Sequence, residues 1–435
     1  MSTRSNSVPS GEAHALYLHI PFCRHRCSYC DFNTYTTVGE LQAPYVAALI
    51  EEIRRVGAAA PARPAVPTVF FGGGTPSLLA PEEVAAILDA AREAFDLSPE
   101  AEITLEANPE TVDVDRLAGF RAAGVNRISY GVQSADAGEL ALLGREHDFA
   151  TAVAAVKAAR EAGFDNLNLD LIYGLPGQSV GDWQRTLDAV LATAATMPVV
   201  THISLYCLTI EPGTPMQRWL HNGTIMAPDP DTAADQYEAA CRAMAGAGFD
   251  HYEISNWARP GRECRHNLVY WRNEPYLGLG AGAHGLAGGY RYQVVRLPRA
   301  YIKRITNYEL RITNEDNAIT NYELRMTNEE GSPAPPLPVS SAPPLPFPLS
   351  PAVAAHHPVD EAEAMSDTVI TQLRLLNEGL DLDGFAARFG RAFDEVYGPQ
   401  LRQLVAWELL RIDGPRLLLT EKGRFLSNQV FYRFV

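Results

Sequence analysis

The stretch HIPFCRHRCSYCDF, residues 19–32, holds half of the cysteines in this chain. Cys23, Cys27 and Cys30 fall within it, and the whole sequence contains six cysteines. The apolar run ALYLHIPF, residues 15–22, leads directly into these cysteines, so they are expected on the loop that follows a buried strand. Soft thiolate side chains gathered on one loop indicate a metal-binding or catalytic site.

The composition is that of a folded protein. Hydrophobic residues make up 46% and charged residues 20% of the 435 residues, close to globular averages. The net charge of −16 would repel a phosphate backbone, so nucleic acid is not an expected partner. The first residues, MSTRSNSVPSGEAHA, lack the apolar core of a signal peptide, and no apolar run reaches the length of a transmembrane segment. We therefore expect a cytoplasmic protein, in which disulfides are rare.

Six apolar or alternating runs are each followed by a stretch with helical periodicity, which predicts an α/β fold. Such alternation favours a parallel sheet with right-handed crossovers, either doubly wound or curled into a barrel. In both architectures the functional site lies at the carboxyl ends of the strands. The six runs are ALYLHIPF (15–22), TVFFGGG (68–74), EITLEANP (102–109), RISYGVQS (127–134), NLNLDLIYGLP (166–176) and HISLYCLTIEP (202–212).

Polar and glycine-rich motifs follow these strands and are expected to converge on one pocket. The glycines of GGGTP (72–76) would let the backbone approach a ligand closely, although three glycines after a strand also suit a tight turn. A carboxylate at this edge can hold an amine or ribose hydroxyls, and a guanidinium can pair with a carboxylate. Each of these side chains could instead be a surface or capping residue. The candidates are Glu106, Gln133, Arg145 and Asp170.

Changes in composition predict four segments. The third combines a tandem repeat, ITNYELRITNEDNA and ITNYELRMTNEEGS, with a proline-rich stretch that has the composition of a linker. The last suggests three helices and a hairpin, a winged-helix-like α+β domain that is slightly acidic and therefore favours an interaction or lid role over DNA binding. The segments are a flexible N-terminus (1–14), the α/β unit with a strand-and-loop extension (15–302), a low-complexity insertion (303–357) and the C-terminal domain (358–435).

Two metal sites suit the cysteine loop. Three thiolates can bind a four-iron cluster and leave one iron open for a cofactor or substrate. The alternative is a structural zinc site completed by His19 or His25. Cys207, Cys241 and Cys264 lie far away along the chain and are expected to be ordinary thiols, although Cys264 precedes His266 by two residues and could join a ligand site there.

The Cys-x3-Cys-x2-Cys loop with its aromatic Tyr29, together with GGGTPS (72–77), resembles the radical S-adenosylmethionine (SAM) superfamily. The motifs LEANPE, SYGVQS, LNLDLIYGLPGQ and SLYCLTIEPGTP are similar to the branch that contains oxygen-independent coproporphyrinogen III oxidase (HemN) and the haem chaperones (HemW). The resemblance implies a partial (β/α)6 barrel and a [4Fe-4S] cluster on Cys23, Cys27 and Cys30. The implied SAM contacts are Tyr17, Tyr29, Gly73, Gly74, Thr75, Glu106, Gln133, Arg145 and Asp170.

Three features separate the members of this branch. The oxidase pattern carries a fourth cysteine where this chain has Phe32, and a longer segment before the cluster loop than the 22 residues present here. The hexapeptide HNLVYW, residues 266–271, matches a motif of the haem chaperones. Histidine is a common haem ligand and aromatic rings pack on porphyrins, although a buried histidine beside two structural aromatics is the plain alternative. The implied haem contacts are His266, Asn267, Tyr270 and Trp271.

The resemblance therefore implies a haem chaperone that binds haem and transfers it to client haemoproteins, with membrane-associated respiratory proteins as one class of client. The alternative is a radical SAM coproporphyrinogen III oxidase acting in haem biosynthesis. A third possibility, from a non-enzymatic class, is a zinc-stabilised scaffold. His284, in GAGAHG (280–285), is flanked by small residues and could face a ligand, although a loop-stabilising role suits it as well.

Overall fold

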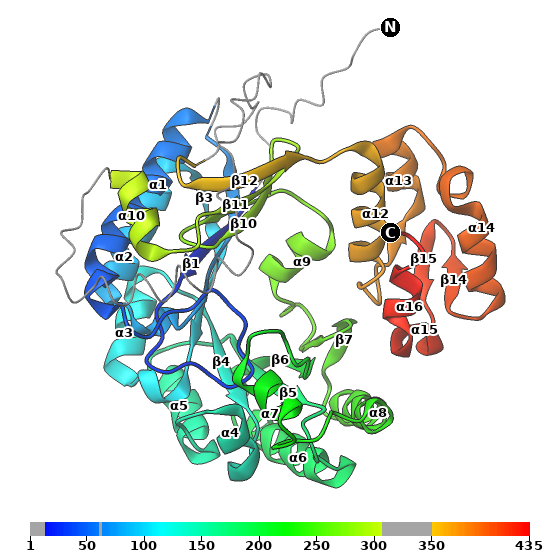
Figure 1. Cartoon of the computed structure of the whole chain (residues 1–435), viewed down its shortest axis with the longest axis horizontal. Helices are drawn as coiled ribbons and strands as arrows, with labels where there is room; N and C mark the ends of the chain where they lie inside the picture. Colours follow the sequence, from blue (N-terminus) through cyan, green and yellow to red (C-terminus); the bar gives the residue numbers. More distant parts are fainter. Residues whose placement is uncertain (1–13, 61–62, 307–349) are drawn as a thin grey trace, which may run out of the picture.

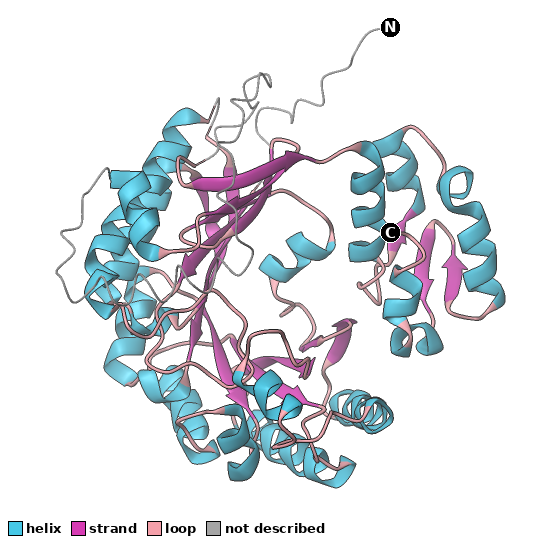
Figure 2. Cartoon of the chain, in the orientation of Figure 1, coloured by secondary structure: helices cyan, strands magenta, loops and turns pink. Residues whose placement is uncertain are grey.

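The computed structural model describes residues 14–60, 63–306 and 350–435. These residues form a strongly curved sheet with helices on its outer side and a smaller C-terminal domain across the open side (Figure 1; Figure 2). The predicted flexible N-terminus, up to residue 13, and residues 307–349 of the predicted insertion lie outside the described residues.

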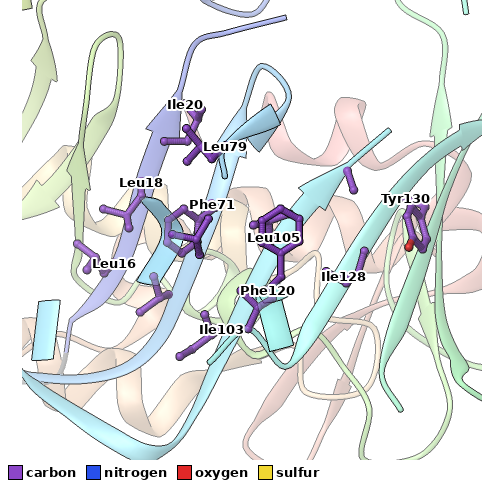
Figure 3. Close-up of a cluster of buried hydrophobic side chains, with 14 of the residues drawn as sticks. Leu16, Leu18, Ile20, Phe71, Leu79, Ile103, Leu105, Phe120, Ile128 and Tyr130 are labelled. Carbon is purple, nitrogen blue, oxygen red and sulfur yellow. The ribbon is translucent and has the colours of Figure 1, made fainter. Parts of the chain in front are cut away.

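The six predicted strands form the centre of the sheet and run parallel in chain order, which confirms the α/β prediction. In β1, β4 and β5 the side chains are buried almost continuously, as expected for strands covered on both faces. Leu18, Phe71, Leu105 and Ile128 from successive strands pack in one layer beneath the helices (Figure 3). The strands are β1 Ala15–Ile20, β2 Ala65–Gly73, β3 Asp96–Ala107, β4 Arg127–Gln133, β5 Leu167–Tyr173 and β6 Val200–Cys207.

The crossover helices have clear sequence signals at their ends. The Asp113 side chain accepts a hydrogen bond from Arg116 N at 2.8 Å and caps α3, which ends at Gly124 with a φ of 117°. Ser179 and Asp182 form a capping box at the start of α6. The helices are α1 Gln42–Ala59, α2 Pro81–Ala94, α3 Val114–Ala123, α4 Ala137–Leu143, α5 Phe149–Glu161, α6 Val180–Thr196, α7 Pro215–His221 and α8 Pro230–Gly246, with short 3-10 turns η1 Gly39–Leu41, η2 Pro76–Leu78 and η3 Pro109–Thr111.

Further strands extend the sheet beyond both ends of the parallel core. Strands β7 and β8 add to β6, while β9 to β12 add to β1, giving a mixed sheet of twelve strands among the described residues. Helix α9 lies on the inner side, between the sheet and the C-terminal domain (Figure 1). The added elements are β7 Asp250–Glu253, β8 Asn256–Ala258, α9 Arg265–Trp271, β9 Tyr276–Leu279, β10 His284–Ala287, β11 Tyr290–Val294, α10 Pro298–Thr306 and β12 Val353–Pro358.

Strand β12 differs from the prediction, because its residues were assigned to the low-complexity insertion. It pairs antiparallel with β11, and Ser350 before it donates a buried hydrogen bond to the carboxylate of Glu52 on α1. Tyr301 on α10 donates to the same carboxylate at 2.6 Å, so the chain segments before residue 307 and after residue 349 meet at one buried acid. The sheet thus includes residues that composition alone assigns to a linker.

The C-terminal domain has the predicted three helices and hairpin, with a small sheet in the order β13-β15-β14. It meets the large unit through polar and ionic contacts near α9, including a bidentate hydrogen bond from Arg272 to Glu378. In the part of the chain that the structure describes, no helix is both long and apolar enough to cross a bilayer. The elements are α12 Glu361–Gln372, β13 Leu380–Asp381, α13 Leu382–Phe389, α14 Phe393–Ala406, β14 Leu410–Asp413, β15 Arg416–Leu419, α15 Glu421–Phe425 and α16 Ser427–Phe431.

Candidate functional site

A cavity of about 490 Å³ opens at the carboxyl ends of the parallel strands; we call it the cluster cavity. The strand-end rule places the predicted side chains there, because parallel strands all end at the same edge of the sheet. Tyr17 is the one predicted cluster or SAM residue that faces elsewhere. The predicted residues that line the cluster cavity are Cys23, Cys27, Tyr29, Cys30, Gly73, Gly74, Thr75, Glu106, Gln133, Arg145 and Asp170.

The cysteine loop is held by backbone contacts on both sides. Cys23 N donates to Tyr35 O at 3.0 Å, and Ser28 N donates to Leu143 O at 3.1 Å. Two of the sulfur atoms already accept side-chain hydrogen bonds, from Thr75 Oγ1 to Cys23 Sγ at 3.5 Å and from Arg145 Nη1 to Cys27 Sγ at 3.3 Å. Such donors stabilise thiolate charge, which suits sulfur ligands of a metal cluster.

No three His, Cys, Asp or Glu side chains of the described residues converge on a position for a single metal ion. A four-iron cluster makes a different demand, because each cysteine binds a different iron and the sulfur atoms stand further apart. Burial raises the pKa of the Cys30 thiol to about 11 and also raises that of Cys23. A bound metal would reverse this effect by deprotonating the thiols outright.

Two carboxyl groups lie on the far side of the cluster cavity. Glu106 accepts a hydrogen bond from Gly73 N at 3.1 Å, and burial, followed by the charge of Asp170, raises its pKa to about 8. Asp170 accepts hydrogen bonds from Ser129 Oγ at 2.9 Å and Asn168 Nδ2 at 2.8 Å, while burial raises its pKa as well. A cationic ligand would favour the ionised form of Glu106, and both acids can accept hydrogen bonds from an amine or a hydroxyl group.

Two polar groups at the cavity have unmet hydrogen-bonding capacity. Gln133 adopts a φ of 69°, uncommon for a residue with a side chain, and its buried Oε1 has no hydrogen-bond partner among the described residues. Arg145 donates to Asn108 Oδ1 at 2.6 Å and to Gly131 O at 2.9 Å, leaving its buried Nε without a partner there. Buried polar groups that lack partners are costly, so both side chains are suited to meet a ligand. The sequence prediction missed Asn108, although it lies inside the EANPE motif.

The hexapeptide HNLVYW forms α9, which is capped from the sheet. The carboxylate of Glu102 on β3 accepts hydrogen bonds from the backbone nitrogens of Arg265 and His266, both at 3.1 Å. Cys264 lies fully buried beneath this cap, with its Sγ 3.5 Å from the same carboxylate. Cys264 does not line the cluster cavity.

His266 is also buried, and both of its ring nitrogens are engaged. Nδ1 is hydrogen-bonded to Thr68 Oγ1 at 2.9 Å and Nε2 to Tyr270 Oη at 2.8 Å. Its ring stacks on Phe70 with centroids 5.1 Å apart. In this conformation neither nitrogen is available to a metal. Asn267 is half-buried. It lines neither the cluster cavity nor the second cavity to which Tyr270 and Trp271 contribute.

The other two predicted haem contacts, Tyr270 and Trp271, line a second cavity of about 670 Å³; we call it the aromatic cavity. Tyr17 also lines the aromatic cavity, so this predicted SAM contact does not face the cluster cavity. The aromatic cavity adjoins the cluster cavity. The residues that line both are Asp31, Phe32, Gly73 and Glu106.

With this geometry in view, the known proteins that resemble the chain are informative. Residues 17–190 match the radical SAM superfamily, and residues 359–426 match the HemN C-terminal domain. The "Heme chaperone HemW" of Mycobacterium tuberculosis is 38% identical over 97% of this chain and 94% of its own length. The chain belongs to the HemW family. The "Heme chaperone HemW" of Bacillus subtilis is 32% identical over 96% of this chain and 98% of its own length.

A solved structure extends the likeness to the whole fold. Coproporphyrinogen III oxidase (HemN) from Escherichia coli matches with a TM-score of 0.76 at 23% identity, covering 98% of this chain and 90% of that one. HemW and HemN chains thus share a fold. Membership of the radical SAM superfamily implies a [4Fe-4S] cluster and SAM. The three thiols and the unpartnered atoms of Gln133 and Arg145 fit such groups.

Proposed function

We propose that this protein is a haem chaperone that binds haem and transfers it to client haemoproteins, with a [4Fe-4S] cluster and SAM beside the haem. The observation that carries the proposal is the pair of adjoining cavities, one lined by the cysteine loop and the other by the aromatic half of HNLVYW. Gly73 and Glu106 form part of their common boundary. The HemW names of the relatives support haem as the cargo.

In the cluster cavity, Cys23, Cys27 and Cys30 would hold the cluster. When bound, the cluster would supply an open iron that takes up the amino and carboxylate groups of SAM. The backbone at Gly74 lies close to the start of the cysteine loop, because a Cβ there would stand 2.6 Å from Phe22 O, while a Cβ at Gly73 would stand 2.4 Å from the His19 ring. A side chain at either position would therefore clash with these neighbours.

The other polar residues of the cluster cavity would position SAM. Gln133 Oε1 can accept a hydrogen bond from its amine or hydroxyl groups, and Arg145 can pair with its carboxylate. Glu106 and Asp170 would accept hydrogen bonds from the amine or ribose hydroxyls of SAM. Tyr29 would complete the wall beside the cysteines.

In the aromatic cavity, Tyr270 and Trp271 would pack against the porphyrin. The cavity volume of about 670 Å³ falls within the range of small-molecule and cofactor sites. It is bordered on one side by the C-terminal domain, since Thr371 of α12 also lines it. We propose that clients, including membrane-associated respiratory proteins, receive haem from this face, and that the protein acts in the cytoplasm.

The test uses the full chain with its cluster reconstituted under anaerobic conditions. Haemin is titrated into the protein and followed by visible absorption, and the loaded protein is then mixed with an apo-haemoprotein acceptor. A saturable Soret shift, followed by transfer faster than from free haemin, is the expected result. Absence of a specific haem signal would overturn the proposal.

The alternative activity, oxidation of coproporphyrinogen III, is tested on the same preparation. The aromatic cavity adjoins the cluster cavity, a placement that also suits a porphyrinogen beside bound SAM. Release of methionine together with decarboxylated product would establish the oxidase. A HemW chaperone is expected to give neither product in proportion to added porphyrinogen.

A further inference from the structure

The histidine that binds the haem iron must offer a free ring nitrogen to the aromatic cavity. His266 does not, because both its nitrogens are hydrogen-bonded and it does not line the cavity. His19 lines it but is nearly fully buried, with its ring nitrogens 3.0 Å from Tyr17 Oη and 3.0 Å from Asn33 O. A metal could bind either ring only after the hydrogen bond at the ligating nitrogen broke.

His284, the first residue of β10, differs from both. It lines the aromatic cavity, is exposed, and its ring makes no hydrogen bond to any residue in the described ranges. Its backbone is closely packed, since a Cβ at Gly278 would stand 1.7 Å from His284 O and a Cβ at Gly285 would stand 2.2 Å from the Tyr292 ring. The neighbouring glycines therefore allow β10 to lie against β9 and β11 and fix the position of this histidine.

The charges around His284 favour the form that binds iron. Partial burial and then the Arg296 charge lower the pKa of His284, so the imidazole is neutral at pH 7. Arg296 itself is exposed, and its guanidinium makes no salt bridge to a carboxylate of the described residues; its Nε donates a hydrogen bond to Asn33 Oδ1 at 3.4 Å. Arg291, in contrast, is already paired with Glu363 and Asp367 of the C-terminal domain.

The phenols of the cavity are weaker candidates. Burial raises the pKa of Tyr276 and of Tyr17, and Tyr17 Oη is also held 3.0 Å from His19 Nδ1. The Tyr270 hydroxyl is occupied by His266. Among the described side chains that line this cavity, a neutral imidazole without a partner is found at His284.

We infer that His284 binds the haem iron and Arg296 pairs with a propionate carboxylate, while His266 serves as a structural residue that ties α9 to β2. The inference rests on the proposed haem-binding function and names its ligands. Under this assignment, Tyr270 and Trp271 contact the porphyrin. Arg296 fixes the orientation of the porphyrin by pairing with a propionate carboxylate on its edge. His266 holds Tyr270 in position from behind.

The experiment is a haemin titration of the full reconstituted chain as wild type, His284→Ala, Arg296→Ala and, as a matched control, the exposed His221→Ala at the end of α7. His284→Ala should shift the Soret maximum and weaken haemin affinity about tenfold or more, as loss of a metal-site interaction commonly does. Added imidazole should restore the wild-type spectrum in that variant. Arg296→Ala should weaken affinity without moving the maximum, and His221→Ala should change neither.

The outcomes separate the inference from the proposed function. If wild type gives no specific Soret shift, the haem-chaperone function itself falls. If wild type binds haemin and His284→Ala binds it with the same spectrum and affinity, only the ligand assignment falls. His266→Ala serves as the second arm: a variant that keeps its fold by circular dichroism should retain the wild-type Soret position, and loss of that position with imidazole rescue would return the ligand to His266.

Discussion

Replacing Arg374 by alanine should destabilise the contact between the two domains far more than replacing its neighbour across the interface, Arg272. Arg374 follows α12, and its Nη2 lies 3.2 Å from Glu253 Oε2 on β7. Its guanidinium also stands 4.2 Å above the Trp271 ring. The Glu253 side chain has no exposed surface, so loss of Arg374 leaves a carboxylate buried without its cation.

The expected cost follows from burial. Removing one partner of a buried pair costs about 3–5 kcal/mol, and the lost cation–π contact adds about 0.5–2 kcal/mol. Arg272 forms a bidentate pair with Glu378, but these side chains are 40% and 43% exposed. An exposed pair contributes only about 0.2–1 kcal/mol, so Arg272→Ala is the matched control for loss of an arginine at the same interface.

The pH dependence gives a second signature. Burial raises the pKa of Glu253 above its ordinary 4.5, while Arg374 lowers it, so removing Arg374 raises it further. A carboxyl group whose pKa is higher in the folded than in the unfolded state stabilises the fold while it is protonated, below about pH 4.5. That stabilisation is lost as the pH rises through the folded-state pKa. The difference in free energy of unfolding between wild type and Arg374→Ala should therefore grow from pH 5 to pH 8.

The assay is urea unfolding followed by tryptophan fluorescence, with limited proteolysis as a measure of domain separation. A Glu253→Gln/Arg374→Met double variant should recover part of the lost stability, because it removes the unpaired charge. Equal shifts in the midpoint for Arg374→Ala and Arg272→Ala, or a difference that does not change with pH, would refute the argument from burial.

Three further predictions concern the cluster cavity and the insertion. Gly73→Ala should weaken SAM binding about tenfold or more in isothermal titration, because its Cβ would stand 2.4 Å from His19 Cε1 at a φ of 110°. Gly163→Ala is the control, since Gly163 has a φ of 89° and no atom within 4 Å of the added Cβ. An equal loss of affinity in Gly163→Ala would contradict the steric cause. SAM affinity of wild type should rise as pH passes about 8, where Glu106 ionises, and should lose that rise in Glu106→Gln; identical profiles would exclude Glu106 as the titrating group. Replacing residues 307–349 by a short Gly/Ser linker should leave the cluster absorption unchanged, since Ile305 and Ser350 on either side are buried and retained; loss of the absorption would show that the segment takes part in cluster assembly.

The central sheet could be predicted because its signals are local. Apolar runs such as ALYLHI at Ala15–Ile20 suit strands covered on both faces, the alternation in RISYGVQ at Arg127–Gln133 has the period of a strand, and Gly124 suits the end of the helix before it. Once six parallel strands were assigned, their carboxyl ends had to share one edge. The grouping of Glu106, Gln133 and Asp170 with the cysteine loop followed from that topology.

Strand β12 could not be predicted in the same way. Its residues, VAAHHP, follow a proline-rich stretch and carry exposed side chains, so they show no alternating pattern. Their place in the sheet comes from backbone pairing with β11 and from the Ser350 contact with Glu52. Both partners are remote in sequence, and local composition carries no signal of either contact.

The sequence by itself determined the cysteine loop, the parallel strands, the convergence of the predicted SAM residues other than Tyr17 and the C-terminal helices, because each depends on spacing or periodicity along the chain. Tertiary structure alone decided which histidine offers an unpaired ring to the aromatic cavity. A hexapeptide motif cannot reveal that Thr68, from a strand nearly two hundred residues earlier, engages one nitrogen of His266. Burial and hydrogen bonding depend on such distant partners, and they leave His284 with its ring open to the cavity.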